Sequence, residues 1–468
     1  MRAFTEPLKE LGGFLEMQAA LKKGSVQVTG CIDAQKSHFI YAAGEPFRKK
    51  LIVTYSELRA KEIYENYRLF DPGVLLYPAK DLIFYSADVQ GNLLVKQRIQ
   101  VLKALLEQKS VTVVTSMGGL MDRLLPLEQI REQAALVESD SELDMEVWVK
   151  KLASMGYERV AQVEMSGQFA VRGGILDIFP LTEDNPVRIE LWGDEVDSIR
   201  SFDVESQRSI ENLESVRIYP ASEFIADDKV IQKGLARMEK EVKKYADRFM
   251  KEMKTEEAFR LKTMLSETRD RLEGWQLTAG LQGLADYFYD DTVSFEEYFG
   301  EDALIVLDEP NRLLQEAQAI EAEFRESMTN RLEKGYVLPG QLNMLCGSGD
   351  VTARLSGRRC LGLCMLEPAG QQWRLPARFG VDVRSVNSYN NSFELLLKDL
   401  MQWKKRGARV ILLCGSRTRA GRLAEDLRDN GLNAFCTEDM DRILKAGEIL
   451  VTNGSAHRGY EYPLIKFV

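Results

Sequence analysis

Short apolar runs alternate with longer helical stretches over the first 130 residues, and this alternation constrains the fold more than any other feature. The expected strands are residues 25–29, 50–54, 74–77 and 111–115. Ser56 is a suitable N-cap for a helix that reaches about Tyr67, and another helix is expected near 91–109. Short apolar strands separated by helices predict a parallel, doubly wound sheet of the α/β class.

A β-rich segment interrupts this pattern between about residues 138 and 220. Glycine, proline and period-two alternation dominate it, notably in the runs 168–180 and 187–192. These features predict an antiparallel unit with tight turns. The charged stretch that follows, from about 228 to 273, has apolar residues near helical spacing. We expect it to be a solvated amphipathic connector.

The rest of the chain returns to mixed α/β character, with an apolar strand at 303–307 and a last unit that opens after Pro376. In that unit we expect a helix near 392–405 and strands near 409–414, 448–452 and 464–468. The predicted division is 1–137 and 223–375 for one α/β domain, 138–222 for a β-rich insertion, and 376–468 for a smaller α/β domain. Because the sequence stops inside an apolar run, we also expect a fragment of a longer protein.

Composition narrows the class of function. The 468 residues exceed what one hydrophobic core normally supports, and the net charge is −10. A protein that coats DNA would normally carry a basic excess, so any contact with nucleic acid must be local or belong to another part of the molecule. The sequence shows no apolar run of about 20 residues and no signal peptide, so we expect a cytoplasmic protein with no membrane partner.

Cysteine and histidine offer little material for chemistry. The six cysteines are scattered, and neither a histidine nor a second cysteine pair near Cys360 and Cys364 completes a zinc set. Reduced core thiols are the expected outcome. His38 and His457 are the only histidines, which leaves almost nothing for Ser–His or Cys–His catalysis.

The segment from Gly30 to Ser37 lies between an expected strand and an expected helix, as a phosphate-binding loop does. It carries the first glycine, the lysine (Lys36) and the serine of the pattern G-x-x-x-x-G-K-[ST], but Gln35 stands at the second glycine position. That glycine allows the backbone to wrap a phosphate with its amides exposed. On this segment alone, a chance near-match and a degenerate loop are equally consistent.

A second segment favours the degenerate loop. Phosphate-loop domains need a strand that ends in Asp, often Asp-Glu, to hold Mg²⁺ and orient water. The apolar strand at 303–307 is followed by Asp308 and Glu309. The β-rich insertion explains how Gly30 and Asp308, far apart in sequence, can belong to one domain. Both acids also suit the start of a helix, so we expect them to be relics rather than catalysts.

In order along the chain, residues 30–37, 172–180, 188–195 and 308–310 resemble landmarks of the excinuclease protein UvrB. The run 202–208 is especially similar to the transcription-repair coupling factor family (Mfd), whose N-terminal half carries a degenerate copy of UvrB. The resemblance covers essentially the whole chain. It implies a RecA/helicase-like doubly wound sheet with a degenerate P-loop, an inserted antiparallel β-rich domain and a second small α/β domain.

Two departures from UvrB bear on function. Its damage-probing aromatic β-hairpin should follow the third strand, yet residues 77–81 pass quickly to the helix near 91, leaving only Phe84 and Tyr85 as aromatics. The phosphate loop is also broken, at Gln35. Both losses would remove lesion verification and the use of ATP.

The resemblance therefore implies a recruiting module. The full-length family protein releases RNA polymerase stalled at DNA lesions by ATP-driven translocation on double-stranded DNA, and it recruits the excinuclease protein UvrA for nucleotide excision repair. This chain would bind UvrA, hold no cofactor and not hydrolyse ATP. ATP, Mg²⁺, RNA polymerase and DNA would be engaged beyond residue 468. One alternative is an active UvrB-like protein that binds damaged DNA, and the other is a structural adaptor without a motor.

A candidate partner-binding face follows from strand alternation. In the run 187–192, alternation sends Val187, Ile189 and Leu191 to one face and Arg188, Glu190 and Trp192 to the other. Phe169 and Val171 mark the apolar side of the preceding strand, so Arg172 falls opposite them.

Arginine and tryptophan are enriched in protein-binding hot spots. The resemblance assigns Arg172, Arg188 and Trp192 as the contacts to UvrA. The residues alone leave another reading open, in which Trp192 covers the small core and both arginines pair with nearby acids, namely Glu190, Asp194 or Glu195.

Overall fold

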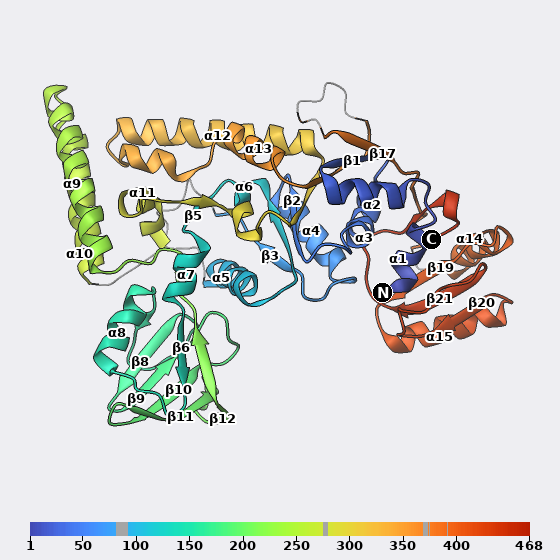
Figure 1. Ribbon diagram of the computed structural model, residues 1–468, viewed down its shortest axis with the longest axis horizontal. Coiled ribbons are helices and arrows are strands. Elements are labelled where there is room, and N and C mark those ends of the chain that lie inside the picture. The colour runs from blue at the N-terminus through green and yellow to red at the C-terminus, as the bar shows by residue number, and fades with distance from the viewer. Residues whose placement is uncertain (81–91, 275–278, 368–372, 374, 391) are drawn as a thin grey trace.

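A seven-stranded sheet forms the centre of the molecule (Figure 1). The computed structural model describes residues 1–80, 92–274, 279–367, 373, 375–390 and 392–468. The strand order is β17-β1-β16-β15-β2-β4-β3 and every pairing is parallel. The strands are β1 (Val26–Thr29), β2 (Lys49–Thr54), β3 (Leu75–Tyr77), β4 (Val111–Ser116), β15 (Leu304–Asp308), β16 (Cys360–Cys364) and β17 (Ala377–Gly380). The expected parallel sheet is confirmed, and β15 pairs with β2, from the first part of the chain, on one side and with β16 on the other.

The sheet buries apolar side chains on both faces. Along β15, Leu304 and Val306 join one cluster, whereas Ile305 and Leu307 join the other. The helices that supply the first cluster are α1 (Arg2–Leu8), α2 (Phe14–Lys23), α3 (Asp33–Ala43) and α4 (Glu57–Tyr67). Those that supply the second are α5 (Asn92–Glu107), α6 (Met117–Leu120), α12 (Pro310–Glu333) and α13 (Ser348–Ser356). Helices on both faces make this a doubly wound sheet.

The β-rich unit forms a separate lobe below α7 (Leu127–Gln133) in Figure 1. Its six-stranded sheet has the order β12-β11-β10-β9-β8-β7, antiparallel except for β7 with β8. The strands are β7 (Glu158–Arg159), β8 (Gln168–Arg172), β9 (Ile175–Ile178), β10 (Val187–Trp192), β11 (Glu195–Phe202) and β12 (Ser209–Leu213). The chain enters through β6 (Ala135–Glu138) and leaves through β13 (Ser215–Ile218), and these two strands pair with each other. Together with α8 (Met145–Ser154), the lobe encloses its own apolar core.

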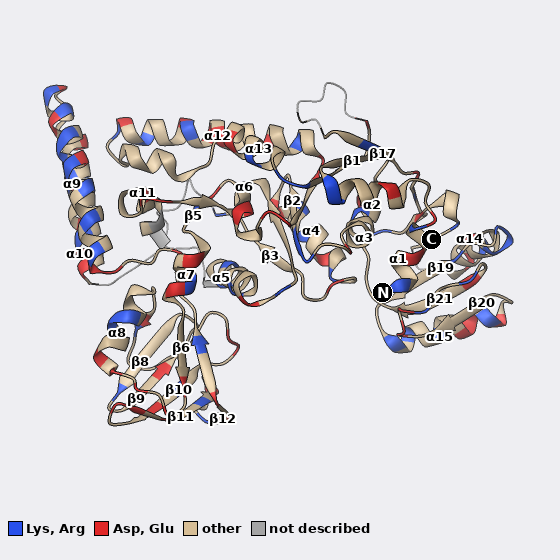
Figure 2. Ribbon diagram, viewed as in Figure 1, with Lys and Arg blue, Asp and Glu red and all other residues tan. Residues whose placement is uncertain are grey.

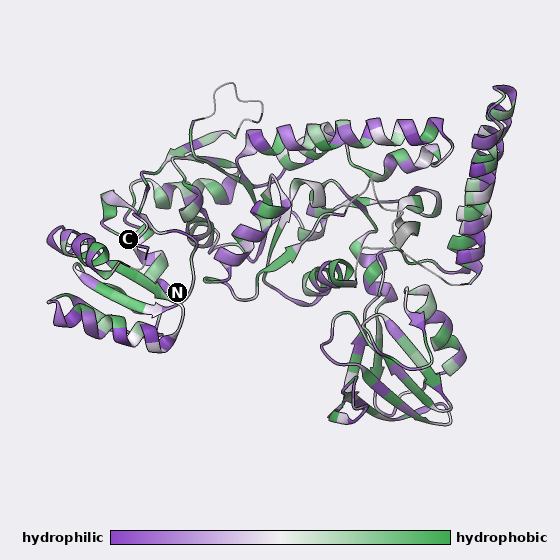
Figure 3. Cartoon of the chain, turned by 180° about the vertical axis from the view of Figure 1, so that it is seen from behind, coloured by the Kyte–Doolittle hydropathy of each residue, from purple (hydrophilic) through white to green (hydrophobic). Residues whose placement is uncertain are grey.

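The charged stretch after this lobe is two helices rather than one, α9 (Asp228–Lys251) and α10 (Thr255–Glu273), which pack against each other. The pair projects from the body (Figure 1) and is predominantly hydrophilic (Figure 3). The apolar side of α9 meets α11 (Ala285–Phe288), and a Cβ at Gly234 would lie 2.0 Å from the Phe288 ring. The amphipathic character expected from sequence is therefore present. Short elements nearby are β5 (Arg123–Leu124), β14 (Val293–Ser294) and the 3-10 turns Ala279–Leu284, Phe295–Phe299 and Pro339–Met344.

The last unit is a three-stranded parallel sheet of order β19-β21-β20. Its elements are α14 (Phe393–Lys405), β19 (Val410–Cys414), α15 (Arg417–Asp429), β20 (Asn433–Cys436) and β21 (Glu448–Asn453), with β18 (Arg384–Ser385) paired to β22 (Tyr460–Glu461) nearby. The expected small α/β unit is confirmed, with two differences. The first is that β17, just after Pro376, belongs to the large sheet because it pairs with the free edge of β1.

The second difference concerns residues 464–468, which are not a strand as expected. Pro463–Ile465 form a 3-10 turn, and Lys466 has a left-handed φ of 51°. Phe467 makes only isolated bridges, to Arg409 and Tyr462. A proline fixes φ and lacks a backbone donor, so the apolar run turns before it pairs along its length.

Two further expectations concern absences. Among the helices of the described residues, none is both long and apolar enough to cross a bilayer. The expected lack of an aromatic hairpin rests on Phe84 and Tyr85, which lie outside the described residues.

Candidate functional site

The phosphate-loop-like segment joins β1 to α3, but little loop is left between them. The helix begins at Asp33, so only Cys31 and Ile32 separate it from Gly30. The amide of Cys31 donates to the carbonyl oxygen of Cys364 at 3.0 Å, and the amide of Gln35 donates to the carbonyl oxygen of Ile32 at 3.1 Å. Two amides that would face a phosphate in an open loop are thus bonded to the protein itself.

Gly30 and Gln35 both have structural partners here. Gly30 has a φ of +85°, and a Cβ on it would lie 2.0 Å from the carbonyl oxygen of Val381. The glycine is therefore required by the close approach of the chain after β17. The Gln35 side chain is fully buried, with Nε2 3.8 Å from the Sγ of Cys31. Gln35 thus lies in the protein interior rather than beside an open loop.

Lys36 is fully buried rather than exposed. Its Nζ lies 2.6 Å from Asp308 Oδ1, 2.8 Å from Glu309 Oε1 and 3.2 Å from Asp33 Oδ1. Burial alone would lower the pKa of this ammonium group, but Asp308 and Glu309 outweigh burial and hold the pKa above its usual value. The structure therefore brings the predicted lysine and the two predicted acids together, as ion partners of one another.

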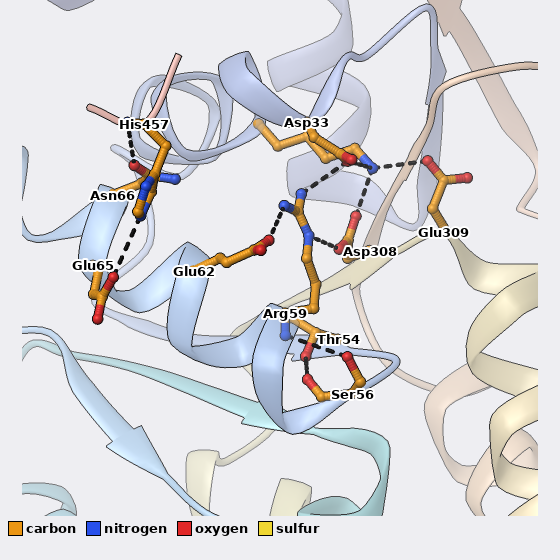
Figure 4. A network of polar contacts seen from close by, with 11 residues as sticks. Asp33, Thr54, Ser56, Arg59, Glu62, Glu65, Asn66, Asp308, Glu309 and His457 are labelled. Atoms are coloured by element: carbon orange, nitrogen blue, oxygen red, sulfur yellow. Dashed lines mark hydrogen bonds and ion pairs between the residues drawn. The ribbon is translucent and has the colours of Figure 1, made fainter.

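Arg59, on α4, completes this group and was not singled out from the sequence (Figure 4). Its Nε lies 2.9 Å from Asp308 Oδ2 and its Nη2 lies 2.9 Å from Asp33 Oδ1. Its Nη1 also lies 3.0 Å from Glu62 Oε2. Burial would lower the pKa of Arg59, but the neighbouring acids, Asp308 above all, raise it. We call Asp33, Lys36, Arg59, Glu62, Asp308 and Glu309 the ion network; Lys36, Arg59 and Asp308 are its buried centre, and Asp33 and Glu62 reach the surface.

Within this network, both oxygens of the Asp308 carboxylate have a cationic partner. Glu309 adopts a φ of 58° at the N-cap of α12, and its Oε1 also accepts the amide of Met365 at 2.8 Å. Ser37 is buried too, and it lines a cavity of about 390 Å³ that it shares with Phe70 and Trp403. The side chains of the phosphate-loop pattern are therefore buried in different surroundings: Gln35 beside Cys31, Lys36 among carboxylates and Ser37 at the wall of a cavity.

The second candidate site is the outer face of the six-stranded sheet. Asp177 on β9 pairs in register with Arg188 on β10. Its Oδ1 accepts Arg188 Nε at 2.7 Å, and its Oδ2 accepts Arg188 Nη2 at 2.9 Å and Arg172 Nη2 at 2.6 Å. Only 1% of the Asp177 residue surface is exposed. One buried carboxylate thus orients both predicted arginines.

Arg188 is held from two further directions. Its guanidinium lies 4.5 Å from the centroid of the Phe202 ring, and its Nη2 donates to Gln207 Oε1 at 3.3 Å. The hydrogen bonds to Asp177 outweigh burial and raise the pKa of Arg188. Arg172 is the more exposed of the two arginines, with 47% of its side-chain surface exposed against 16% for Arg188.

Trp192 ends β10 and is 83% exposed. Val187 and Ile189 on the same strand are buried, so the expected alternation is present. The alternative in which Trp192 covers the core is wrong, and Asp177 is the acid that both arginines share. Glu190 pairs with Arg200 instead. Asp177 was missed from the sequence, although its place between the apolar Leu176 and Ile178 puts it on the opposite face of an alternating strand, the face of Arg172 and Arg188.

Comparisons with known proteins agree with this architecture. Residues 136–224 match the family described as the UvrB interaction domain, a range that includes the whole six-stranded sheet. The chain is 30% identical to the transcription-repair-coupling factor of Bacillus subtilis (strain 168), over 98% of this chain and 39% of the relative. It is 27% identical to the factor of Staphylococcus epidermidis (strain ATCC 12228 / FDA PCI 1200), with the same coverage. The resemblance stated from sequence is confirmed, and the chain spans about two fifths of the length of these curated relatives.

Proposed function

We propose that this chain, similar to transcription-repair-coupling factors along almost its whole length, is the part of such a factor that recruits UvrA. The proposed contact is the outer face of the six-stranded sheet, centred on Arg172, Arg188 and Trp192. The match of residues 136–224 to the UvrB interaction domain supports this assignment. So does the likeness to the coupling factors over 98% of the chain.

The observation that carries the proposal is an exposed tryptophan on the sheet face that also presents two oriented arginines. A tryptophan with 83% of its surface exposed offers a large apolar area for a partner to bury, and tryptophan is enriched in binding hot spots. Asp177 and Phe202 fix Arg188 before a partner arrives, so little side-chain entropy remains to be lost on binding. The two arginines are thus oriented before binding, and Trp192 adds an exposed apolar anchor on the same face.

We further propose that the chain does not hydrolyse ATP. A nucleotide at the phosphate-loop-like segment would have to unwind the first turn of α3 and separate Lys36 from two acids. Arg59 would have to release Asp308 before that carboxylate could hold Mg²⁺. The active UvrB-like alternative requires all of these rearrangements, so we favour the recruiting role.

The activity of the whole protein is a proposal as well. Release of stalled RNA polymerase by ATP-driven translocation on double-stranded DNA would need ATP, Mg²⁺ and a motor supplied from outside these 468 residues. A structural adaptor without a motor remains the second candidate. The two candidates differ in an RNA polymerase release assay. Release that is lost when a motor is inactivated would favour the coupling-factor role over the adaptor role.

The test of UvrA recruitment is a titration of purified UvrA against the chain and three variants, Arg172→Ala, Arg188→Glu and Trp192→Ala. We expect Arg188→Glu to weaken binding by at least about 2 kcal/mol, roughly 30-fold, because it reverses the charge at the centre of the face. A glutamate there would also face the buried Asp177, so the thermal midpoint of every variant is measured beside its binding, and Trp192→Ala tests the face without touching that pair. The matched control is Arg217→Glu on β13, outside the six-stranded sheet. UvrB should compete for the same face. If all three variants bind UvrA like the unmodified chain, the interface lies elsewhere.

A further inference from the structure

The exposed side of α9 carries a basic stripe although the chain as a whole has a net charge of −10. The helix contains eight lysines and arginines and four acids. Seven of the basic residues recur at steps of three or four, at positions 229, 233, 237, 240, 244, 248 and 251. At about 100° per residue these positions fall within one arc, turned away from the buried Met238 and Val242. Figure 2 shows Lys and Arg recurring along this projecting helix.

Five lysines of α9 are exposed and, among the described residues, have no carboxylate partner: Lys229, Lys240, Lys244 and Lys251 of the stripe, and Lys243 beside it. Two acids of the helix are engaged elsewhere, since Glu239 pairs with Arg269 and Glu241 accepts the hydroxyl of Tyr287. Asp247 is the acid that falls within the basic arc. The other basic residues of the stripe are already neutralised, by Asp290 or by Glu252.

We propose that this stripe is a binding surface for the phosphate backbone of duplex DNA. From residue 229 to residue 251 the stripe is roughly 33 Å long, at about 1.5 Å per residue. One turn of B-DNA has about the same length, roughly 34 Å. A duplex offers one phosphate per about 1.7 Å of its axis, so each unpaired lysine can find a phosphate near its own place along the helix.

The chemistry of the stripe favours a duplex over other polyanions. Lysines are depleted in protein–protein interfaces, and the stripe has no exposed aromatic anchor, so an acidic protein is a poorer fit. Single-stranded nucleic acid is usually held by stacking on aromatic side chains, and Tyr245 is partly buried against the α9 core. The site is also separate from the proposed UvrA face, because α9 projects from the body whereas the six-stranded sheet forms its own lobe below α7 (Figure 1).

The test is fluorescence anisotropy of an undamaged 30-base-pair duplex titrated with the chain between about 25 and 150 mM salt. The variant is Lys240→Gln/Lys243→Gln/Lys244→Gln. We expect saturable low-salt binding, an affinity loss of at least about tenfold in the variant, and a salt-dependence slope lowered by about 0.9 for each lysine that contacts a phosphate. Exposed positions on a helix tolerate glutamine, and circular dichroism checks that α9 persists.

The matched control, Lys22→Gln/Lys23→Gln/Lys61→Gln, removes the same charge from exposed positions on α2 and α4. It should bind DNA like the unmodified chain. An equal loss in both triple variants, or no binding at 25 mM salt, overturns the proposal. Tighter binding of poly-glutamate than of duplex at equal charge would assign the stripe to an acidic protein instead. UvrA binding is measured in a separate titration, so a negative DNA result does not decide the recruitment proposal.

Discussion

Replacing Lys36 by methionine distinguishes a structural ion network from a nucleotide site. In the structure Lys36 is fully buried, with three carboxylates within 3.2 Å of its Nζ. Breaking a buried ion pair from one side costs about 3–5 kcal/mol, since the remaining charge stays buried. Arg59 still neutralises one oxygen of Asp308, so we expect the lower end, about 3 kcal/mol. For a domain of this size, that loss lowers the thermal midpoint by roughly 6–12 °C.

The assay is thermal and urea unfolding of Lys36→Met at pH 7, beside Lys22→Met as an exposed control on α2. The double variant Lys36→Met/Asp308→Asn should recover part of the loss, because the uncompensated carboxylate is then neutral. The sign of the pH dependence follows from the raised pKa of Lys36. Its stabilising contribution is complete below the unfolded pKa of about 10.5 and is lost as the pH rises through the higher folded value.

A functional phosphate loop would give the opposite pattern. Its lysine faces the nucleotide, so Lys36→Met would abolish ATP binding and leave the stability of the nucleotide-free protein nearly unchanged. Stability within about 0.5 kcal/mol of the unmodified chain, which is the range of an ordinary surface substitution, would refute the network argument.

Three further predictions concern nucleotide, DNA and acid. Calorimetric titration with Mg-ATP should show no specific binding, and micromolar binding that Lys36→Ala abolishes would contradict this. Glu309→Gln should leave the ATPase rate of the purified chain unchanged. Damaged and undamaged duplexes should bind equally weakly at physiological salt, because the chain is acidic overall and the basic stripe contacts only phosphates. Nanomolar, lesion-selective binding in a competition assay would contradict this expectation. Burial would raise the pKa of Glu223, but Arg98 and Lys80 outweigh burial and lower it to about 2. The contribution of ionised Glu223 to the free energy of unfolding should therefore be complete above about pH 4.5 and decline toward pH 2. The acid-unfolding curve of Glu223→Gln should lack this decline.

Local patterns predicted the large sheet well, because its strands are short apolar runs bounded by helix signals. The N-cap at Ser56 is an example, since its Oγ accepts the amide of Arg59 at 3.3 Å as the sequence suggests. The turn at Pro463–Ile465 was missed because apolar content outweighed a proline that blocks pairing. Edge strand β17 was assigned to the wrong unit, since nothing local shows which sheet a half-buried strand joins.

The sequence predicted which residues belong to the candidate sites better than it predicted which of them contact one another. Lys36, Asp308 and Glu309 stood out through their spacing from strands. Arg59 did not, because its partner Asp308 lies far along the chain and only the sheet order brings them together. Asp177 was hidden for a related reason. Its neighbours Arg172 and Arg188 come from two different strands, and pairing register is a tertiary property.

The strand order of the large sheet has a consequence for the timing of folding during synthesis. β1 and β2 are not neighbours, because β15 and β16 lie between them. Those two central strands leave the ribosome only after the whole β-rich lobe, and β16 follows β1 by about 330 residues, a delay of roughly 15 to 65 seconds at about 5–20 residues per second. The lobe has its own core and closes on itself through β6 and β13, so it can fold while β1 still lacks a partner. The nascent chain therefore exposes apolar strand edges for that interval, and a chaperone that covers them should raise the yield of the native protein.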